Sequence, residues 1–289
     1  MNSVLRSSTR EVRIGADRPF VIIGEKINPT GHKRLAAALL EGDLAYIQEL
    51  AQLQVAWGAE VLDINVGVPG LDEVAMISRV IEAVMSVTDV PLCIDSGNPK
   101  VLAAGLSAAP GKPLVNSVSG EESRLESILP LVKERGAAVI GLTIDDNGIP
   151  ATSEERVAVA EKILDRAGKI GIPLEDVIID PLVLTVGSDS QAAMLTLQSI
   201  GLLQREFGVN INLGASNVSY GLPERLAINQ AFIALTIQAG ATCGIADPAR
   251  LGMTIKATDL LLGRDVHAAR FIKYFRAAEK LRANDDPSK

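Results

Sequence analysis

The sequence predicts a (β/α)8 barrel, also called a TIM barrel, in which eight parallel strands alternate with helices and close into a ring. Three observations support this fold class. Eight short apolar runs begin near residues 19, 59, 91, 113, 137, 176, 210 and 241. Nearly every run ends on a small polar residue and is followed by sequence of helical type. The length of 289 residues suits one such domain, so we expect a single domain over 1–289.

The eight runs have the composition of strands that are buried on both faces. Each is short, apolar and rich in β-branched residues, as parallel strands covered by helices are. An open, doubly wound sheet is the competing fold. The even spacing of the runs and the lack of a G-x-G-x-x-G segment favour the closed barrel. We expect the barrel core over residues 19–278, preceded by an extension at 1–18.

Helix signals lie between the strand candidates. Asp43 is a candidate N-cap for a helix over 44–57, and Gly58 directly follows that helix. Further helices are expected over 71–87, 191–206, 223–240, 250–261 and 267–283, with a frayed tail at 284–289. The helix over 71–87 would carry one apolar stripe made of Val74, Ile77, Val80 or Ile81, and Val84.

Two further helix starts are predicted from paired residues. Ser119 with Glu122, and Thr152 with Glu155, have the spacing of a capping box ahead of apolar periodic sequence. In such a box the hydroxyl and the carboxylate each accept a hydrogen bond from an otherwise unpaired backbone N–H. Helices are therefore expected to begin at both places.

Composition and charge exclude several classes of protein. With 47% apolar residues the chain can bury a large core, and its net charge of −7 argues against nucleic acid, which needs clustered Lys and Arg. No run approaches the ~18 apolar residues of a membrane span, and the first residues lack the apolar segment of a signal peptide. We therefore expect a cytoplasmic protein in which the two cysteines, Cys93 and Cys243, are reduced core residues.

Metal and nucleophile sites are disfavoured because histidine is scarce. The chain has two histidines, His32 in the loop after the first strand candidate and His267 at the start of the last helix. No Cys-x-x-Cys or His-x-x-x-His spacing occurs, so no metal site is expected. No G-x-S-x-G segment occurs either, and His32 is interpreted as a solvated loop residue.

The polar residues at the strand ends are the candidate site. In a parallel barrel these ends meet at one mouth, where TIM-barrel enzymes have their active sites. Carboxylates accept hydrogen bonds, so Asp63, Asp95 and Asp180 suit a ligand rich in N–H donors. Asn116 and Asn217 both donate and accept, which suits a heterocycle with mixed amide and amine edges. A phosphate ligand fits less well, because no Gly-rich segment followed by Lys is present.

Some strand-end residues have a simpler interpretation as helix caps. Asn65, Asp145 and Asp247 each precede helical sequence and could serve only as N-caps. Capping explains Asp95, Asn116 and Asp180 less well, since each directly ends an apolar run.

Seven motifs, in chain order and each at a strand end, carry a resemblance to a known family. They are GEKINPTG (24–31), LDINVG (62–67), CIDSGN (93–98), VNSVSGE (115–121), IGLTIDDNGIP (140–150), IIDPL (178–182) and LGASNVSYGLP (213–223). Together they resemble the pterin-binding TIM barrels, and most closely the methyltetrahydrofolate:corrinoid methyltransferases. The resemblance covers residues from about 20 to 275. Each motif alone is weak, but the ordered set is specific.

The resemblance implies roles for the residues that match the family's motifs. Asp95, Asn116 and Asp180 match positions that hydrogen-bond the pterin ring, and Asn217 matches the catalytic asparagine beside the pterin N5. The remaining substrate-site and supporting residues are Gly214, Ser216, Tyr220, Arg225, Glu25, Asn28 and Asp63. Tyr220 departs from the polar amide of the best-known relatives, which leaves its role open.

The resemblance also implies the substrates and partner. The substrate would be tetrahydrofolate or 5-methyltetrahydrofolate, and the second reactant the cobalt of a corrinoid (cobalamin) held by a partner protein. A homodimer is expected on the same ground. The direction of transfer stays open between methyl donation for acetyl-CoA synthesis and methyl acceptance in a demethylation system, with a slight preference for the second.

The segment Asp265-Val-His267-Ala-Ala-Arg270 is not interpreted as a cobalamin site of this chain. Cobalamin-binding domains use Asp-x-His-x-x-Gly, whereas Arg270 stands here in place of the glycine. Too few residues follow it to form the α/β module to which that motif belongs. The corrinoid is therefore expected to come from the partner.

Three rival functions remain. A dihydropteroate synthase would need cations for a pyrophosphate and an Arg-x-His near the last strand, where this chain has Ile245-Ala-Asp-Pro248. A non-catalytic folate-binding or corrinoid-docking subunit would not need Asn217. An unrelated TIM-barrel enzyme would require the ordered motifs to coincide by chance.

Overall fold

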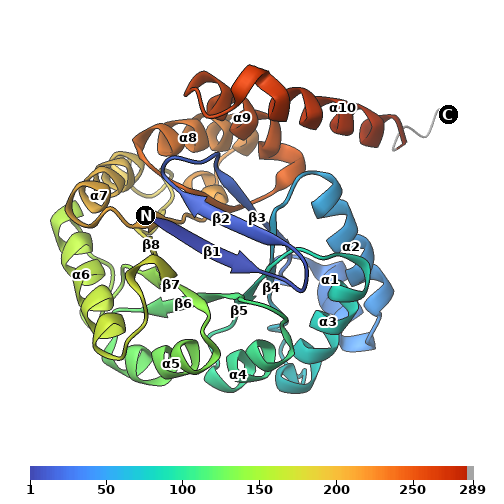
Figure 1. The fold of residues 1–289 in the computed structure, drawn as a ribbon, viewed down its shortest axis with the longest axis horizontal. Helices are drawn as coiled ribbons and strands as arrows, with labels where there is room; N and C mark the ends of the chain where they lie inside the picture. The colour runs from blue at the N-terminus through green and yellow to red at the C-terminus, as the bar shows by residue number, and fades with distance from the viewer. Residues whose placement is uncertain (285–289) are drawn as a thin grey trace.

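The computed structural model describes residues 1–284, and its centre is a ring of eight parallel strands (Figure 1). Their order is β10-β3-β4-β5-β6-β7-β8-β9. The strands are β3 (Val21–Ile27), β4 (Val61–Ile64), β5 (Leu92–Asp95), β6 (Leu114–Ser119), β7 (Ala138–Leu142), β8 (Val177–Asp180), β9 (Asn210–Ile211) and β10 (Cys243–Ala246). All eight predicted strands are confirmed, and so is the fold class.

The ring closes between β9 and β10, where the regular pairing is shortest. β9 has only two residues, but the chain beyond it continues the contact. The amide of Thr242 donates to the Ile211 carbonyl and the amide of Ile245 donates to the Leu213 carbonyl, both at 3.0 Å. An isolated parallel bridge joins Gly214 to Ile245. The sheet is therefore a closed barrel.

Helices surround the ring and bury their apolar faces against it (Figure 1). They are α1 (Lys33–Glu41), α2 (Leu44–Ala56), α3 (Glu73–Val87), α4 (Pro99–Ala108), α5 (Glu122–Arg135), α6 (Ser153–Lys169), α7 (Ala192–Phe207), α8 (Arg225–Ala239) and α9 (Pro248–Leu261), and a further helix, α10 (Ala269–Asn284), follows them. Three short 3-10 helices are η1 (Leu174–Asp176), η2 (Ala215–Ser219) and η3 (Val266–Ala268). The five helices predicted by range beyond residue 70 are present within about two residues at most ends, while α1 and α4 were not assigned ranges from sequence.

Helices begin after all three predicted capping positions, α2 at Leu44, α5 at Glu122 and α6 at Ser153, and two of the three predicted caps are confirmed. Asp43 accepts a hydrogen bond from the Tyr46 amide at the start of α2, and Gly58 follows that helix with a φ of +88°. Thr152 and Glu155 form the complete capping box of α6.

The capping box predicted at Ser119 and Glu122 is wrong. Ser119 is the last residue of β6, and its hydroxyl donates to the Glu121 carboxylate at 2.6 Å. Glu121 is the N-cap position of α5 and makes no side-chain capping bond. Ser119 pairs with Leu142 of β7 and lies two residues before the N-cap position, so its hydroxyl does not reach the first turn of α5 as a cap.

The predicted apolar stripe of α3 is correct except at its first residue. Ile77, Val80, Ile81 and Val84 are fully buried, but Val74 is 40% exposed. Asp72 caps α3 by accepting from the Ala75 amide, so Val74 lies in the first turn. Met76 is buried there instead of Val74.

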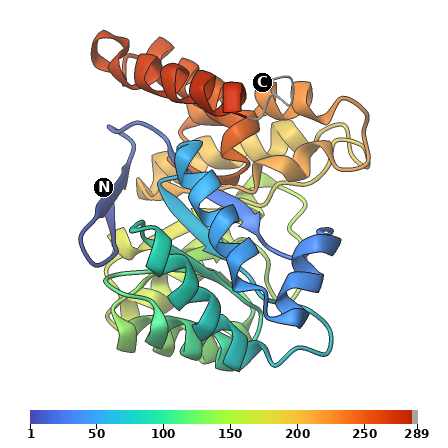
Figure 2. The ribbon, with the colours of Figure 1, turned by 90° about the vertical axis from the view of Figure 1, so that its right-hand side faces the viewer.

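The extension at 1–18 forms a structure that the sequence did not predict. β1 (Asn2–Arg6) and β2 (Glu11–Gly15) make an antiparallel hairpin that lies across the N-terminal end of the barrel (Figures 1 and 2). Leu5 and Ile14 point into the barrel and are fully buried. Each run is only five residues long and half polar, so it lacks the signal of the buried strands.

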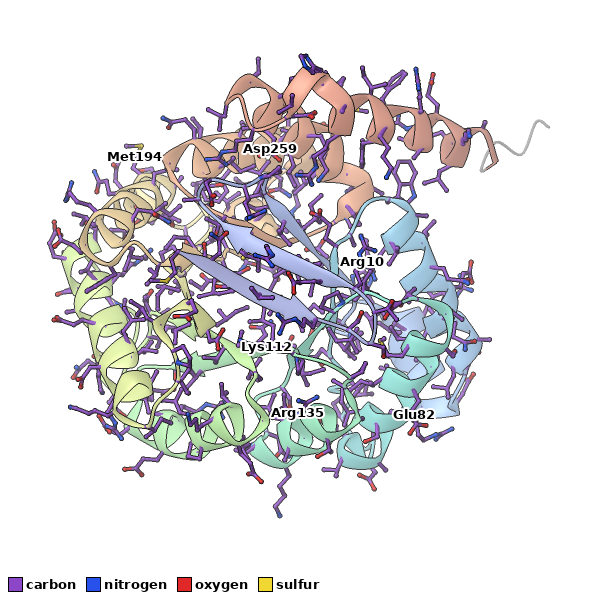
Figure 3. All side chains as sticks on the ribbon, viewed as in Figure 1. Arg10, Glu82, Lys112, Arg135, Met194 and Asp259 are labelled. Carbon is purple, nitrogen blue, oxygen red and sulfur yellow. The ribbon has the colours of Figure 1, made fainter. Side chains whose placement is uncertain are left out.

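Hydrogen bonds attach this hairpin to the barrel strands. Asn210 of β9 donates through Nδ2 to the Ser3 hydroxyl at 2.8 Å and to the Ile14 carbonyl at 3.0 Å. The amides of Arg6 and Lys112 each donate to the other residue's carbonyl at 2.9 Å, and Lys112 lies beside the hairpin in Figure 3. The hairpin therefore closes the end of the barrel opposite the strand ends that carry the candidate site.

The last helix, α10, lies outside the ring of barrel helices and packs on α9 (Figure 2). Tyr274 and Ala278 contact Trp57, and the Tyr274 hydroxyl donates to the Pro248 carbonyl at 2.9 Å. Residues 285–289 of the predicted frayed tail lie outside the described residues. Within residues 1–284, none of the helices combines the length and apolar character that a bilayer crossing requires.

Shortening Leu5 is expected to destabilise the whole barrel, because its side chain fills the N-terminal end. Leu5→Ala should lower the free energy of unfolding by about 2–5 kcal/mol, measured by urea denaturation. Leu53→Ala is the matched control, since Leu53 is 43% exposed on α2 and should change stability by no more than about 0.5 kcal/mol. Equal effects of the two substitutions would contradict this role of the hairpin.

Candidate active site

Asp95 lies at the end of β5, where two asparagines from neighbouring strand ends hold it. The Nδ2 atoms of Asn65 and Asn28 donate to the same carboxylate oxygen, Oδ2, at 2.9 Å and 3.3 Å. Burial raises the pKa of Asp95, and the hydrogen bond from Asn65 opposes that rise. Among the described residues no side chain donates to Asp95 Oδ1, so that oxygen can accept from a ligand.

Asn116 and Asp63 form a second pair beside it. Asn116 donates through Nδ2 to Asp63 Oδ1 at 3.1 Å, which leaves the Asn116 carbonyl oxygen as an acceptor. Asp63 is almost fully buried, and burial together with the neighbouring Asp95 carboxylate raises the pKa of Asp63 well above its usual range. Asp63 therefore lies beneath Asn116 and orients it, whereas Asn116 itself is only half-buried.

Asp180 ends β8 and is held from two sides. The Leu182 amide donates to Oδ1 at 2.9 Å, and Asn212 donates through Nδ2 to Oδ2 at 2.8 Å. Burial raises the pKa of Asp180 to about 6, opposed by these two hydrogen bonds and by the charge of Arg156. Arg156 is itself buried and donates through Nη1 to the Pro181 and Leu182 carbonyls at 2.7 Å and 2.8 Å.

The LGASN segment forms a tight turn that carries Asn217. The Asn217 amide donates to the Gly214 carbonyl at 3.2 Å at the start of η2, and the Asn217 side chain is exposed at the mouth. A Cβ atom at position 214 would lie 3.0 Å from Asn217 Nδ2, so a side chain there would crowd the amide. Gly214 therefore allows Asn217 its position.

Arg225 holds the far side of the same turn. It donates through Nη2 to the Ser216 carbonyl at 2.7 Å and through Nε to the Ser219 hydroxyl at 3.1 Å. Its guanidinium carbon lies 5.9 Å from the centre of the Tyr220 ring, and that ring is 70% exposed. The Tyr220 ring thus faces solvent and contacts Arg225 through a cation–π interaction, while the Tyr220 amide donates to the Asn217 carbonyl at 3.1 Å.

Glu25 connects the turn to the end of β3 through a small polar cavity of about 100 Å³. The Ser216 hydroxyl donates to Glu25 Oε2 at 3.4 Å, and burial raises the pKa of Glu25. Beside it Lys26 forms an ion pair with Asp247 at 2.6 Å. All the predicted supporting residues therefore lie at the mouth, at the ends of β3 and β4.

The three residues interpreted as possible caps have different positions in the structure. Asp247 does cap α9 by accepting from the Ala249 amide at 3.0 Å. Asp145 closes a turn with the amide of Asn147 at 2.8 Å, and the N-cap of the following helix α6 is Thr152, so the interpretation of Asp145 as a cap was wrong. Asn65 caps no helix, so that interpretation was wrong: its Oδ1 accepts from the Gly67 amide while its Nδ2 holds Asp95.

Sequence reasoning missed Asn212, Lys26 and Arg156 as parts of this region. Asn212 is a polar residue inside the apolar run INLG, and that interruption was the available signal. Lys26 lies within GEKIN next to the predicted Glu25. Nothing in the local sequence of α6 distinguishes Arg156 from an exposed arginine.

The described residues contain no group of three or more His, Cys, Asp and Glu side chains placed to hold a metal ion. Cys93 and Cys243 are buried free thiols, as predicted. His32 is exposed at the start of α1, also as predicted, and His267 is exposed in η3.

The fold and the mouth together define the class of protein: a (β/α)8 barrel whose strand ends carry a cup of carboxylates and amides. The sequence profile of the family described as pterin binding enzyme matches residues 24–247, which contain all of these strand ends. The chain belongs to this family of pterin-binding enzymes.

Curated relatives cover most of the chain. The methylcorrinoid:tetrahydrofolate methyltransferase of Eubacterium limosum is 32% identical over 265 residues, which are 89% of this chain and 96% of that protein. The methionine synthase of Mycobacterium tuberculosis is 31% identical over 248 residues, which are 81% of this chain. The chain spans only about a fifth of that synthase, 21% of its length.

Solved structures share the fold at low sequence identity. A dihydropteroate synthase from Xanthomonas albilineans superposes with a TM-score of 0.69 at 22% identity, covering 92% of this chain and all of that one. The dihydropteroate synthase from Yersinia pestis also gives 0.69, at 18% identity, covering 90% of this chain and 98% of that one. At these identities the likeness establishes the pterin-binding barrel fold and nothing finer.

Replacing Asp180 is expected to change how stability depends on pH. The pKa of this carboxyl is about 6 in the folded protein and about 4 in an unfolded chain. Between these values the unfolded state loses its proton first, so the free energy of unfolding falls as pH rises, by up to about 3 kcal/mol. Asp180→Asn should remove this part of the fall.

Urea unfolding of the wild-type protein and the variant at several pH values between about 4 and 7 measures this difference. Some slope should remain in the variant, because the raised pKa values of Asp63 and Asp95 act in the same direction. An identical slope in both proteins would contradict the buried, titrating Asp180.

Proposed function

We propose that this protein is a methyltransferase that moves a methyl group between N5 of 5-methyltetrahydrofolate and the cobalt of a corrinoid carried by a partner protein. The observation that carries the proposal is the arrangement of Asp95, Asn116, Asp180 and Asn217 around one barrel mouth. The 32% identity to a methyltransferase of matching length supports it.

The three inner residues suit the polar edge of a pterin. Asp95 and Asp180 are acceptors when ionised, and a pterin offers them an exocyclic amine and a ring N–H. Asn116 presents its carbonyl oxygen, because its amide nitrogen is committed to Asp63. Since each of the three is held by a partner beneath it, the cup requires little ordering when the ligand binds.

Asn217 is the proposed catalytic residue. N5 is a poor leaving group when the bond to the methyl carbon breaks, unless it receives a proton or a hydrogen bond. An amide donor that strengthens its bond to N5 as charge develops stabilises the transition state more than the ground state. Asn217 can do this at any pH, because an amide does not titrate.

The reaction balances in both directions. In one direction, Co(I) takes the methyl cation from N5, and N5 ends with a proton that comes from water. In the other, the N5 lone pair attacks the methyl of methyl-Co(III), Co(I) leaves with the bonding pair, and N5 loses its proton. We propose the second direction as the physiological one, supported by the similarity to the methylcorrinoid:tetrahydrofolate methyltransferase of Eubacterium limosum.

We further propose that the corrinoid arrives on a separate protein, that the enzyme is a homodimer, and that it is cytoplasmic. The open mouth supports the first point, since Asn217 and Tyr220 are exposed there. Family resemblance supports the second, and two free cysteine thiols, which suit a reducing compartment, support the third.

A dihydropteroate synthase is the less favoured alternative. At the end of β10 the chain has Ile245-Ala-Asp-Pro248 in place of the Arg-x-His expected for such a synthase. The Asp247 carboxylate there caps α9 and pairs with Lys26. A non-catalytic folate-binding subunit is distinguished by the following substitution.

Asn217→Ala is expected to lower kcat for methyl transfer by about a hundredfold or more, while tetrahydrofolate binding changes much less, because the lost donor acts mainly in the transition state. Methyl exchange between 5-methyltetrahydrofolate and cob(I)alamin, run in both directions, measures it. Gln52→Ala, which removes an exposed amide on the outer helix α2, is the matched control. Unchanged transfer by Asn217→Ala would leave a non-catalytic binding role.

Asp95→Ala is expected to weaken tetrahydrofolate binding by about ten- to a hundredfold, because charge-assisted hydrogen bonds contribute about 1.5–3 kcal/mol. Fluorescence titration of the wild-type protein and the variant at neutral pH measures the two Kd values. Equal affinities would remove Asp95 from the proposed ligand site.

A further inference from the structure

Asn212 is a fully buried amide in a position where a barrel normally has an apolar side chain. It directly follows β9, and its exposed fraction is zero. Burying an amide without hydrogen bonds costs free energy, so the hydrogen-bond partners of Asn212 indicate its role. Its Nδ2 donates to Asp180 Oδ2 at 2.8 Å, and its Oδ1 accepts a weak bond from the Cys243 thiol at 3.8 Å.

Asp180 has few other groups around it. The Leu182 amide donates to its Oδ1 from the loop after β8. The charge of Arg156 on α6 acts through space, because the Arg156 Nη1 atom is bonded to backbone carbonyls. From β10 the neutral Cys243 thiol lies nearby, and burial raises its pKa far above neutrality. Asn212 is therefore the side chain that donates directly to this carboxylate.

The two direct donors fix the plane of the carboxylate. Each carboxylate oxygen can accept about two hydrogen bonds, and Leu182 and Asn212 use one on each oxygen. One acceptor direction therefore stays free on Oδ1 and one on Oδ2. Two parallel acceptors in a fixed plane match a ligand edge with two adjacent N–H donors, such as an amine next to a ring N–H.

We propose that Asn212 is a positioning residue that holds Asp180 ionised and correctly oriented for the N–H edge of the pterin. The proposal rests on the proposed function, since it takes Asp180 as a ligand-binding residue. The carboxylate is useful to such a ligand only when ionised, because the protonated form has lost one acceptor. An amide that donates to the ionised form favours that form.

Removing the donor is expected to shift the pH dependence of folate binding. Asp180 has a pKa of about 6 with Asn212 in place, so affinity should fall as the pH drops through that value. Without the Asn212 amide, one of the hydrogen bonds that oppose the effect of burial on the Asp180 pKa is lost. The midpoint of the pH dependence of binding should therefore move to higher pH. If the midpoint rises by about one pH unit, the variant should bind tetrahydrofolate about tenfold more weakly than the wild-type protein at acidic pH, and equally well at alkaline pH.

Asn212→Val tests this, with Asn210→Val as the matched control. Both asparagines are buried, Asn210 in β9 and Asn212 directly after it, but Asn210 bonds the N-terminal hairpin and makes no bond to Asp180. Tetrahydrofolate Kd values measured between about pH 5.5 and 8.5 should give a raised midpoint for Asn212→Val and the wild-type midpoint for Asn210→Val. Asn212→Ala is a second variant for which we expect the same raised midpoint, and it replaces Asn212→Val if valine disturbs folding.

A ligand-free measurement separates the two proposals. The carboxyl ¹³C resonance of Asp180, assigned with Asp180→Asn, should titrate at higher pH in Asn212→Val than in the wild-type protein. If the wild-type protein binds tetrahydrofolate and neither midpoint moves in the variants, the role of Asn212 is overturned and the proposed function stands. If the resonance shifts but the wild-type protein binds no tetrahydrofolate, the proposed function is overturned.

Discussion

Closure of the barrel between β9 and β10 is the constraint on which the site depends. The two backbone hydrogen bonds to Ile211 and Leu213 complete a ring that would otherwise be an open sheet. Closure brings the turn that carries Asn217 next to Glu25. The Ser216 hydroxyl of this turn contacts the Glu25 carboxylate, although the two residues are 191 positions apart in the chain. An open sheet would place these groups at opposite edges, and no single mouth would exist.

Inside this mouth, burial disfavours the ionised form of the carboxylates, and hydrogen bonds from neighbouring strand ends favour it. Each proposed pterin-binding side chain pairs with a polar residue from another strand end: Asp95 with Asn65, Asn116 with Asp63, and Asp180 with Asn212. Without such donors a buried carboxylate would take up a proton and lose acceptor capacity. The pairs also fix side-chain orientation before a ligand arrives, which reduces the entropy lost on binding.

Much of the fold followed from the sequence because its signals are local. Eight apolar runs and the Thr152–Glu155 box report on neighbouring residues, and the structure contains all of them. Predictions failed where a distant segment decided the outcome. Ser119 pairs with β7 instead of capping α5, and Asn65 turns to Asp95 instead of capping a helix. The N-terminal hairpin escaped prediction because its two short strands acquire their buried face only by docking on the barrel.

By itself, the sequence determined the barrel, the set of polar residues at its mouth and the family to which the chain belongs, because strand ends and their motifs are contiguous in the chain. Only the tertiary structure decided how these residues are paired: which oxygen of Asp95 remains available, and that Asn212 holds Asp180. The reason is physical. Hydrogen bonds between side chains depend on the stagger of neighbouring strands around the closed ring, and no single strand contains that information.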